Sequence, residues 1–380
     1  MYNFSFKLAC KFVGIGALFF ALLSFNWDRV ELEGRAFVVA IGIDANEEGE
    51  GYAVAMSIAN IAAIEGEEGS QEGILKTATG ISLAEAMGQI DAKISDKVYY
   101  GHTKAIVIGQ SVLEYEDMLR EVVGTLERES DINTKTIIMA TDKTAKQVLE
   151  TKPDEQSLIG LYLSRFYNAN NANTAAFLVK LDLEGLISGL RASGGAVIPK
   201  VTVKDDTAVI AGVMVLSDYS LKGYIEEEAM AGYLWLMANG AGSHVAIDAD
   251  DGHTTLLVEK SSTKLRFSID EGGSSDSGGL RLLADFNAHG SIEGARFYDS
   301  GRHDEEKING LQRSFEDKIK AEIEEIFFIF RDDFGFDGLG LRELMRKGYP
   351  RLYEMYGGDF INAFRDMEIF VEADVLIRNT

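Results

Sequence analysis

Three aspartates toward the C-terminal end could bind calcium, because carboxylate oxygens are the ligands that this ion prefers. Asp332, Asp333 and Asp337 are followed by a glycine, which resembles the start of a calcium loop. Counted from Asp333, however, position three is Gly335 and position twelve is Leu344, where such a loop needs a bidentate glutamate. We therefore interpret the segment as a solvated acidic turn.

Two other patterns could support proton transfer or phosphate binding. His102 lies two residues before Lys104 at the entry to a predicted strand, and such a pair can act as acid and base. No serine or cysteine stands in a recognisable nucleophile elbow, so we interpret His102 as a strand-end histidine bonded to backbone. The glycine- and serine-rich run 271–279 lacks the lysine and the spacing of a nucleotide-binding loop, which favours a hairpin tip.

The remaining candidates are weaker. Glu127, Arg128, Glu129 and Asp131 form a charged cluster after a predicted helix, and helix termination with surface ion pairing explains it. The five histidines are scattered, and the single cysteine, Cys10, cannot form an internal disulfide or a thiolate zinc site. We therefore predict no catalytic residue, no cofactor-binding residue, no metal ligand and no cofactor.

Length and charge narrow the class of protein. A chain of 380 residues is long enough for two or three domains. Its 46% hydrophobic and 26% charged residues are ordinary for a globular protein with a real core. The formal net charge of −24 repels phosphates, so we exclude a nucleic acid partner.

The N-terminus has the pattern of an export signal. Lys7 and Lys11 precede an uncharged apolar run over 12–25, and charge returns at Asp28. The run is short for a membrane span of about 20 residues, although Trp27 could extend it to the interface. The lysines favour a cytoplasmic N-terminus and a body outside. Because no cleavage site fits well, we predict an uncleaved anchor.

The segments that must position these residues alternate between strands and helices. Apolar runs over 36–44 and 52–60 flank a glycine-containing turn and predict an antiparallel pair. Ser82 with Glu85 three residues later predicts a capped helix over 83–95. Strands are expected over 104–109 and 135–140, helices over 114–128 and 144–151, and a polar loop over 61–79.

The C-terminal half continues this alternation. We expect a helix over 174–188, a strand over 208–217, a turn over 217–220 and a helix over 226–237. Strands follow over 254–259, 264–269 and 280–287, then a long helix over 304–331 with apolar residues at three- and four-residue spacing, and a closing strand over 367–378. The order predicts an α+β fold of mixed sheets with helices.

Four groups of short motifs follow one another along nearly the whole chain from Trp27 on. They are WDRVELE at 27–33 with RAFV at 35–38 and IGID at 41–44; YYGHTK at 99–104 with IVIG at 106–109; AGVMVL at 211–216 with LKGY at 221–224 and GYLW at 232–235; and DDFG at 332–335 with Tyr349 and Pro350. In this order and spacing the chain resembles the Ger(x)C family, the C subunits of bacterial spore germinant receptors.

The resemblance implies a non-enzymatic subunit required for nutrient-triggered spore germination, acting through protein–protein contacts. It implies an elongated body of three α+β domains on the outer face of the inner spore membrane. The implied partners are the integral membrane A and B subunits of the receptor. With the predicted elements, it suggests a signal or anchor over 1–27 and domains over 28–200, 201–255 and 256–380.

One position departs from the family pattern. Members usually carry a lipidated cysteine immediately before the tryptophan, whereas Asn26 precedes Trp27 here. We therefore predict no lipidation site: either the apolar segment stays as the anchor, or the chain is a divergent copy. Two alternatives remain, an extracytoplasmic protein that binds small solutes in a cleft between lobes, and an exported hydrolase with converging titratable groups.

Overall fold

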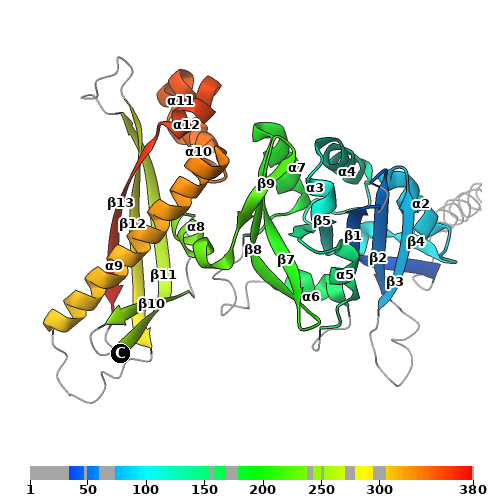
Figure 1. Cartoon of the computed structure of the whole chain (residues 1–380), viewed down its shortest axis with the longest axis horizontal. Helices are drawn as coiled ribbons and strands as arrows, with labels where there is room; N and C mark the ends of the chain where they lie inside the picture. The colour runs from blue at the N-terminus through cyan, green and yellow to red at the C-terminus, as the bar shows by residue number, and fades with distance from the viewer. Residues whose placement is uncertain are drawn as a thin grey trace, which may run out of the picture.

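The computed structural model shows an elongated molecule with two β-sheets, one toward each end of its long axis (Figure 1). It describes residues 34–46, 49–59, 73–153, 158–167, 179–237, 243–249, 252–269, 279–293 and 305–378. The predicted α+β fold of mixed sheets with helices is confirmed. The predicted division into domains over 28–200, 201–255 and 256–380 stays a prediction.

Within the described residues, the first sheet has nine strands in the order β3-β2-β1-β5-β6-β7-β8-β9, with β4 paired to the start of β1. Strands β1, β5, β6 and β7 run parallel, and antiparallel strands flank them on both sides. The bounds are β1 (Arg35–Ala45), β2 (Tyr52–Ala59), β3 (Gly73–Gly80), β4 (Lys97–Tyr99), β5 (Ala105–Gly109), β6 (Ile137–Thr141), β7 (Ala196–Lys204), β8 (Thr207–Ser217) and β9 (Ser220–Ile225).

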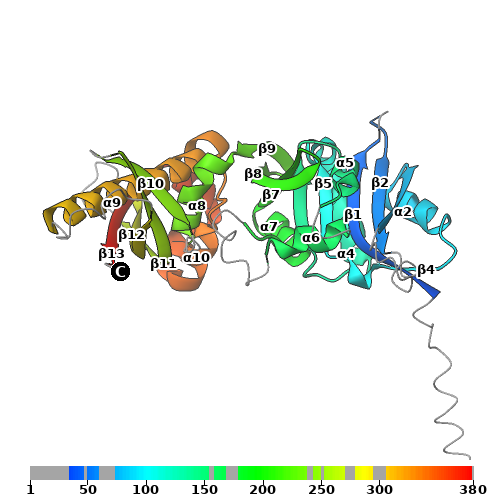
Figure 2. The same ribbon diagram turned by 90° about the horizontal axis from the view of Figure 1, so that it is seen from below.

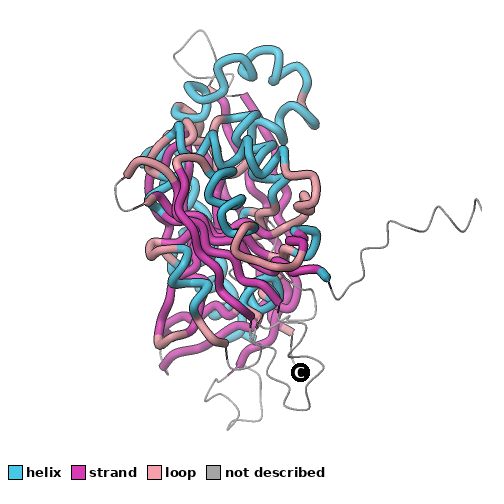
Figure 3. The backbone as a smooth tube through the Cα atoms, turned by 90° about the vertical axis from the view of Figure 1, so that its right-hand side faces the viewer, coloured by secondary structure: helices cyan, strands magenta, loops and turns pink. Residues whose placement is uncertain are grey.

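Helices cover both faces of this sheet (Figure 3). One face packs on α2 (Leu83–Asp91), α3 (Gln110–Leu113), α4 (Glu116–Arg128) and α7 (Leu183–Ser193). The other face packs on α5 (Ala145–Glu150) and α6 (Ile159–Arg165). Alternation along β1 explains how one strand serves both layers, since Ile41 and Ile43 enter the first core and Ala40 the second.

The second sheet is covered by helices on one face. Among the described residues it has four strands in the order β10-β11-β12-β13, namely β10 (His244–Ala249), β11 (Gly252–Ile269), β12 (Leu280–Glu293) and β13 (Glu368–Ile377). Its core side packs on α8 (Met230–Leu236) and the long α9 (Glu305–Phe328), while α10 (Leu341–Gly348), α11 (Pro350–Tyr356) and α12 (Phe360–Arg365) gather near one end of it (Figure 1). Short helices fill the gaps: η3 (Tyr100–His102), η5 (Glu227–Ala229), the π-helix η7 (Ile329–Phe334) and η8 (Gly357–Asp359).

Local sequence signals account for several elements. The predicted pair of β1 and β2 is confirmed as antiparallel, with Ile41 opposite Met56. The Ser82 hydroxyl accepts the backbone N–H of Glu85 and starts α2, as predicted. The Glu85 carboxylate reaches the backbone N–H of Ile81 rather than that of Ser82, so only half of the capping box forms.

Four predicted elements need correction. The loop over 61–79 is wrong for its second part, because β3 pairs with β2 there, whereas residues 61–72 lie outside the described residues. The helix over 174–188 begins later, since Asp182 caps α7 at Leu183 and 179–182 is not helical. The strands over 254–259 and 264–269 are one continuous strand, β11. The long helix over 304–331 changes from α to π geometry after Phe328.

Candidate functional site

The suspected calcium residues are engaged in local structure. Asp337 is buried, and its carboxylate accepts the backbone N–H groups of Leu341 at 2.9 Å and Arg342 at 2.8 Å at the start of α10. Burial raises the pKa of Asp337 despite these hydrogen bonds. Asp332 accepts two hydrogen bonds from Arg331, at 2.6 and 2.9 Å, which lower the pKa of Asp332. In the part of the chain that the structure describes, no group of three His, Cys, Asp or Glu side chains could hold a metal ion.

The other candidates from the sequence do not converge either. The His102 ring stacks on Phe37 with centroids 4.9 Å apart, rather than bonding to backbone as predicted. Glu127 pairs with Arg191 at 2.6 Å and so ties α4 to α7. The run 271–278, Cys10, Asn26 and the predicted leader lie outside the described residues. Among the helices that the structure describes, none has the length and apolarity needed to cross a bilayer.

The IGID motif fixes helix α5 on the sheet. Asp44 is only 6% exposed, and its carboxylate accepts the backbone N–H of Ala145 at 2.8 Å and of Lys146 at 3.2 Å. A Cβ atom on Gly42 would lie 3.1 Å from that of Ala145, so the glycine allows close packing. Burial raises the pKa of Asp44. The motif therefore caps and seats a helix and leaves no free carboxylate oxygen for chemistry.

The glycines of the AGVMVL and GYLW motifs stand where backbones approach. Gly212 has φ +86°, and a Cβ there would lie 2.1 Å from the Ile225 carbonyl oxygen. Gly232 lies where α8 crosses α9, and a Cβ there would lie 1.9 Å from the Glu322 carbonyl oxygen. Trp235 donates from Nε1 to the Glu322 carboxylate at 2.7 Å, across the same crossing. These motifs build the C-terminal core.

The two sheets meet at a joint that involves the DDFG motif. We use "the joint" for Phe334, Phe336 and Arg342 together with their partners Gly223, Gly195 and Ala192. The Phe334 ring packs on Gly223 of β9, where a Cβ would lie 2.8 Å from it, and the Phe336 ring packs on Gly195, where a Cβ would lie 2.3 Å from it. Arg342 donates from Nη1 to the Ala192 carbonyl at 3.3 Å.

The hairpin of β7 and β8 belongs to both cores at this joint. Ile198, Met214 and Leu216 enter the core of the first sheet. Val197, Val213 and Val215 enter the core built by α8, α9 and the second sheet. Because neighbouring residues of one hairpin face opposite cores, the two sheets are joined by a shared layer of side chains.

A cavity of about 710 Å³ lies beside the joint. Its lining includes Val197, Tyr233, Asp337, Arg342, Glu343 and Tyr353. Burial raises the pKa of Tyr233 to about 12, and hydrogen bonds from Arg346 and Lys347 lower the pKa of Glu343 to about 2. Neither group changes its protonation near neutral pH, so neither suits general acid–base catalysis there. Asp337, which also lines the cavity and whose pKa is raised by burial, has its carboxylate held by backbone N–H groups at the start of α10.

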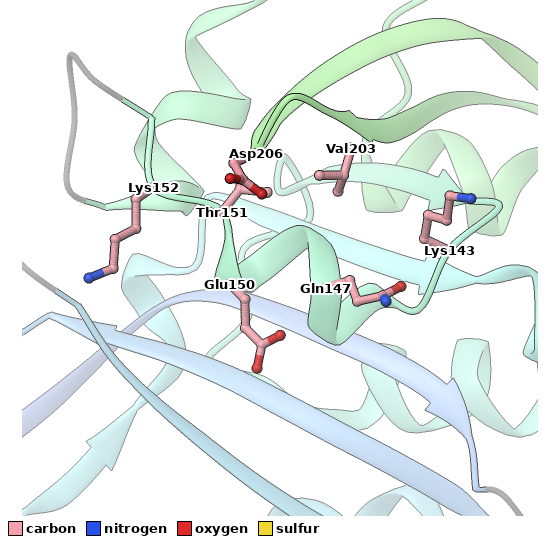
Figure 4. A pocket seen from close by; sticks show the side chains of 7 residues that line it. All are labelled: Lys143, Gln147, Glu150, Thr151, Lys152, Val203 and Asp206. Carbon is pink, nitrogen blue, oxygen red and sulfur yellow. The ribbon is translucent and has the colours of Figure 1, made fainter.

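A second hollow, of about 510 Å³, lies between α5 and the turn that joins β7 to β8 (Figure 4). It is lined by Lys143, Gln147, Glu150, Thr151, Lys152, Val203 and Asp206. Figure 4 shows Lys143 and Lys152 at opposite ends and the Glu150 carboxylate pointing away from Asp206. The charged groups do not face one point, so the hollow has no arrangement for metal binding or catalysis.

Comparisons with known proteins agree with this architecture. Residues 28–203 match the family described as "Spore germination protein N-terminal domain", and residues 211–380 match "Spore germination B3/GerAC like, C-terminal". Spore germination protein KC of Bacillus subtilis (strain 168) is 22% identical, over 93% of this chain and 91% of that protein. YfkR of the same organism is also 22% identical, over 94% and 93% of the two chains.

A solved structure has the same fold. The crystal structure of the GerBC protein superposes with a TM-score of 0.61, covering 89% of this chain and 97% of that one at 15% sequence identity. The two family matches together span almost all of the chain from residue 28 on, and they confirm the resemblance that the short motifs indicate. This chain therefore belongs to the GerAC family of spore germination proteins, the C subunits of germinant receptors.

Proposed function

We propose that this chain is a non-enzymatic, membrane-associated subunit of a nutrient germinant receptor, acting through contacts with the integral membrane A and B subunits. Its body lies on the outer face of the inner spore membrane, and the apolar segment over 12–25 holds it there. The family membership and the leader support this placement.

The observation that carries the proposal is that three buried or half-buried acids serve as hydrogen-bond acceptors within the fold. Asp44 and Asp337 cap helices, and Glu322 binds the Trp235 indole across a helix crossing. Burial raises the pKa of each of these three carboxyl groups, which is a feature that active sites share. Here, however, each carboxylate accepts hydrogen bonds from backbone N–H groups or from an indole N–H. These side chains therefore stabilise the fold, which in turn presents surfaces to partners.

Co-purification tests the proposal. A C-terminally tagged full-length chain, expressed from its own locus, is extracted with mild detergent from spore membranes. We expect both polytopic subunits to co-purify with it, and we expect deletion of the gene to abolish nutrient-triggered loss of optical density in spore suspensions. Mass measurement of the mature chain should show the intact leader, with neither an acyl group nor cleavage after the apolar run.

Two variants sharpen this experiment. Phe334→Ala removes a ring from the joint and should reduce both recovery of the partners and germination. Gly88→Ala, at an open position on α2 with nothing within 4 Å, is the matched control and should leave both unchanged. A chain that purifies alone while germination remains normal would contradict the proposal, as would turnover of esters, peptides or glycosides by the purified chain.

The cavity beside the joint supports a second candidate, binding of a small solute between two lobes. Its volume of about 710 Å³ falls within the range typical of small-molecule sites. Calorimetric titration of the full-length chain with amino acids and sugars tests this directly. Saturable heat that disappears in Tyr233→Ala but persists in Gly88→Ala would favour the solute-binding candidate.

A further inference from the structure

A small aromatic and basic corner lies where the described chain begins. We use "the corner" for Arg35, Phe37, Lys97, Tyr99 and His102, at the start of β1 and along β4 and η3. The Arg35 guanidinium lies 5.1 Å from the centroid of the Tyr99 ring, and Tyr99 contacts Phe37 and His102 edge-on at 5.8 and 5.6 Å. Figure 2 shows the start of β1 and β4 together, at the end of the molecule remote from the second sheet.

The cations at this corner form no ion pair within the part of the chain that the structure describes. Among the described residues, the side chains of Arg35, Lys97 and the nearby Lys104 have no ion-pair or hydrogen-bond partner, and the buried Nε atom of Arg35 has no acceptor. Lys97, His102 and Lys104 are exposed. The neighbouring acid Asp96 accepts a hydrogen bond from Ser95. The Ser95 hydroxyl is neutral and leaves the charge of Asp96 in place, but the three cations outnumber this acid, so an anionic group that approaches the corner meets net positive charge.

The sequence places this corner near a bilayer. The predicted apolar segment ends at Phe25, and eight residues, 26–33, separate it from Gly34, the first described residue. Even fully extended, eight residues span at most about 30 Å. The linker carries Asp28, Glu31 and Glu33 against Arg29, so it is itself net acidic. Attraction to an anionic surface must therefore come from the folded corner.

We infer that the corner rests on the anionic phospholipid headgroups of the membrane into which the leader inserts. The inference depends on the membrane residence in the proposed function and adds the orientation of the body. Tyr99 and His102 have the amphipathic rings that suit a headgroup layer, and the free cations supply charge complementarity. The whole chain has a formal net charge of −24, so anionic lipid attracts the body at a basic corner such as this one.

Because the linker over 26–33 joins the corner to the leader, a weak contact between the corner and lipid is sufficient. A linker of only eight residues keeps the corner at an effective concentration of about millimolar near the bilayer, so the corner needs little intrinsic affinity. Each basic residue near an anionic leaflet strengthens binding about fivefold. The attraction acts only within a Debye length of about 10 Å, which the linker allows the corner to reach.

The histidines allow a test within one molecule. Full-length chain is reconstituted in vesicles of phosphatidylcholine alone or with 30% phosphatidylglycerol, and labelled with diethyl pyrocarbonate. His102 reports the corner, while the exposed His253 on β11 is the internal control. We expect the labelling rate of His102 relative to His253 to fall about fivefold in anionic vesicles. At 1 M salt, where the Debye length is about 3 Å, this protection should be lost.

Charge reversal provides the matched controls. K97E/K104E should abolish the protection of His102, whereas K143E/K204E, at exposed lysines elsewhere on the same half, should leave it intact. Equal labelling in both vesicle types, with the chain still floating with vesicles, overturns the corner contact and leaves the proposed function standing. Failure to float contradicts membrane residence and overturns both. Protection that appears only after the polytopic subunits are added overturns the lipid contact in favour of a protein interface.

Discussion

A double-mutant cycle on Gly223 and Phe334 tests whether the joint couples the two sheets. A Cβ at Gly223 would lie 2.8 Å from Cε1 and 3.4 Å from Cζ of the Phe334 ring, and the next atom, at 3.9 Å, belongs to the same ring. The backbone of Gly223 is not in the left-handed region, so alanine is sterically allowed there. The three nearest atoms to the added methyl group therefore all belong to one side chain from the other half of the molecule.

The expected effect of Gly223→Ala on the free energy of unfolding differs in sign between the wild-type chain and the Phe334→Ala chain. A glycine in a strand interior makes the folded chain less stable than an alanine there would, by about 0.5–1 kcal/mol. With Phe334 present, forcing a methyl group into the contact costs about 1–3 kcal/mol, which exceeds that gain. Gly223→Ala should therefore destabilise the wild-type chain and stabilise the Phe334→Ala chain. The coupling energy equals the overpacking cost, about 1–3 kcal/mol.

Urea titration of the four proteins in detergent provides the measurement. The chain has two tryptophans, so all four proteins carry Trp27→Phe, which leaves Trp235 as the single tryptophan for selective excitation. Trp235 is 1% exposed in the second core and reports unfolding of that half, while far-UV circular dichroism reports both. The same effect of Gly223→Ala in both backgrounds would refute the contact across the joint.

Two further predictions concern single positions. Gly232→Ala should destabilise the chain by about 1–3 kcal/mol, because its Cβ would lie 1.9 Å from a backbone oxygen. Gly88→Ala, in the open interior of α2, should instead stabilise the chain by about 0.5–1 kcal/mol. Thermal unfolding distinguishes the two signs. Asp44 has a pKa above its usual value of 3.8 in the folded chain, so folding favours its protonated form. The stability of the wild-type chain relative to Asp44→Asn should therefore rise as the pH falls through the folded pKa of Asp44 and level off near 3.8. Denaturation at several pH values measures this difference, and a constant difference would contradict the prediction.

Elements with a complete local signal could be predicted from the sequence. The β-branched run of β1 is buried over nearly its whole length, and Ser82, Thr144 and Asp182 accept backbone N–H groups at the starts of their helices. The cap at Asp182 also explains the error over 174–188, because the sequence between 174 and 181 is apolar enough for a helix, whereas the side chain that starts one comes later.

Other elements lack such a signal. Strand β3 pairs on one side only, so its sequence is mixed and resembles a loop. The polar middle of β11, near Glu259 and Lys264, is largely exposed and looks like a break, although pairing with β12 continues through it. The joint could not be predicted at all, because Phe334 meets Gly223 across more than one hundred residues of chain and neither residue carries a local pattern.

The motifs that identify the family describe its shape rather than its ligand. Gly42, Gly212 and Gly232 are required because a backbone or a helix lies against them, and Asp44 because a helix start needs an acceptor. Such requirements come from the neighbouring backbone and do not depend on any ligand or partner. An exposed side chain such as that of Lys97 is under no such constraint. The corner joins both kinds of residue, since Arg35, Phe37, Tyr99 and His102 belong to the RAFV and YYGHTK motifs, whereas Lys97 lies outside them.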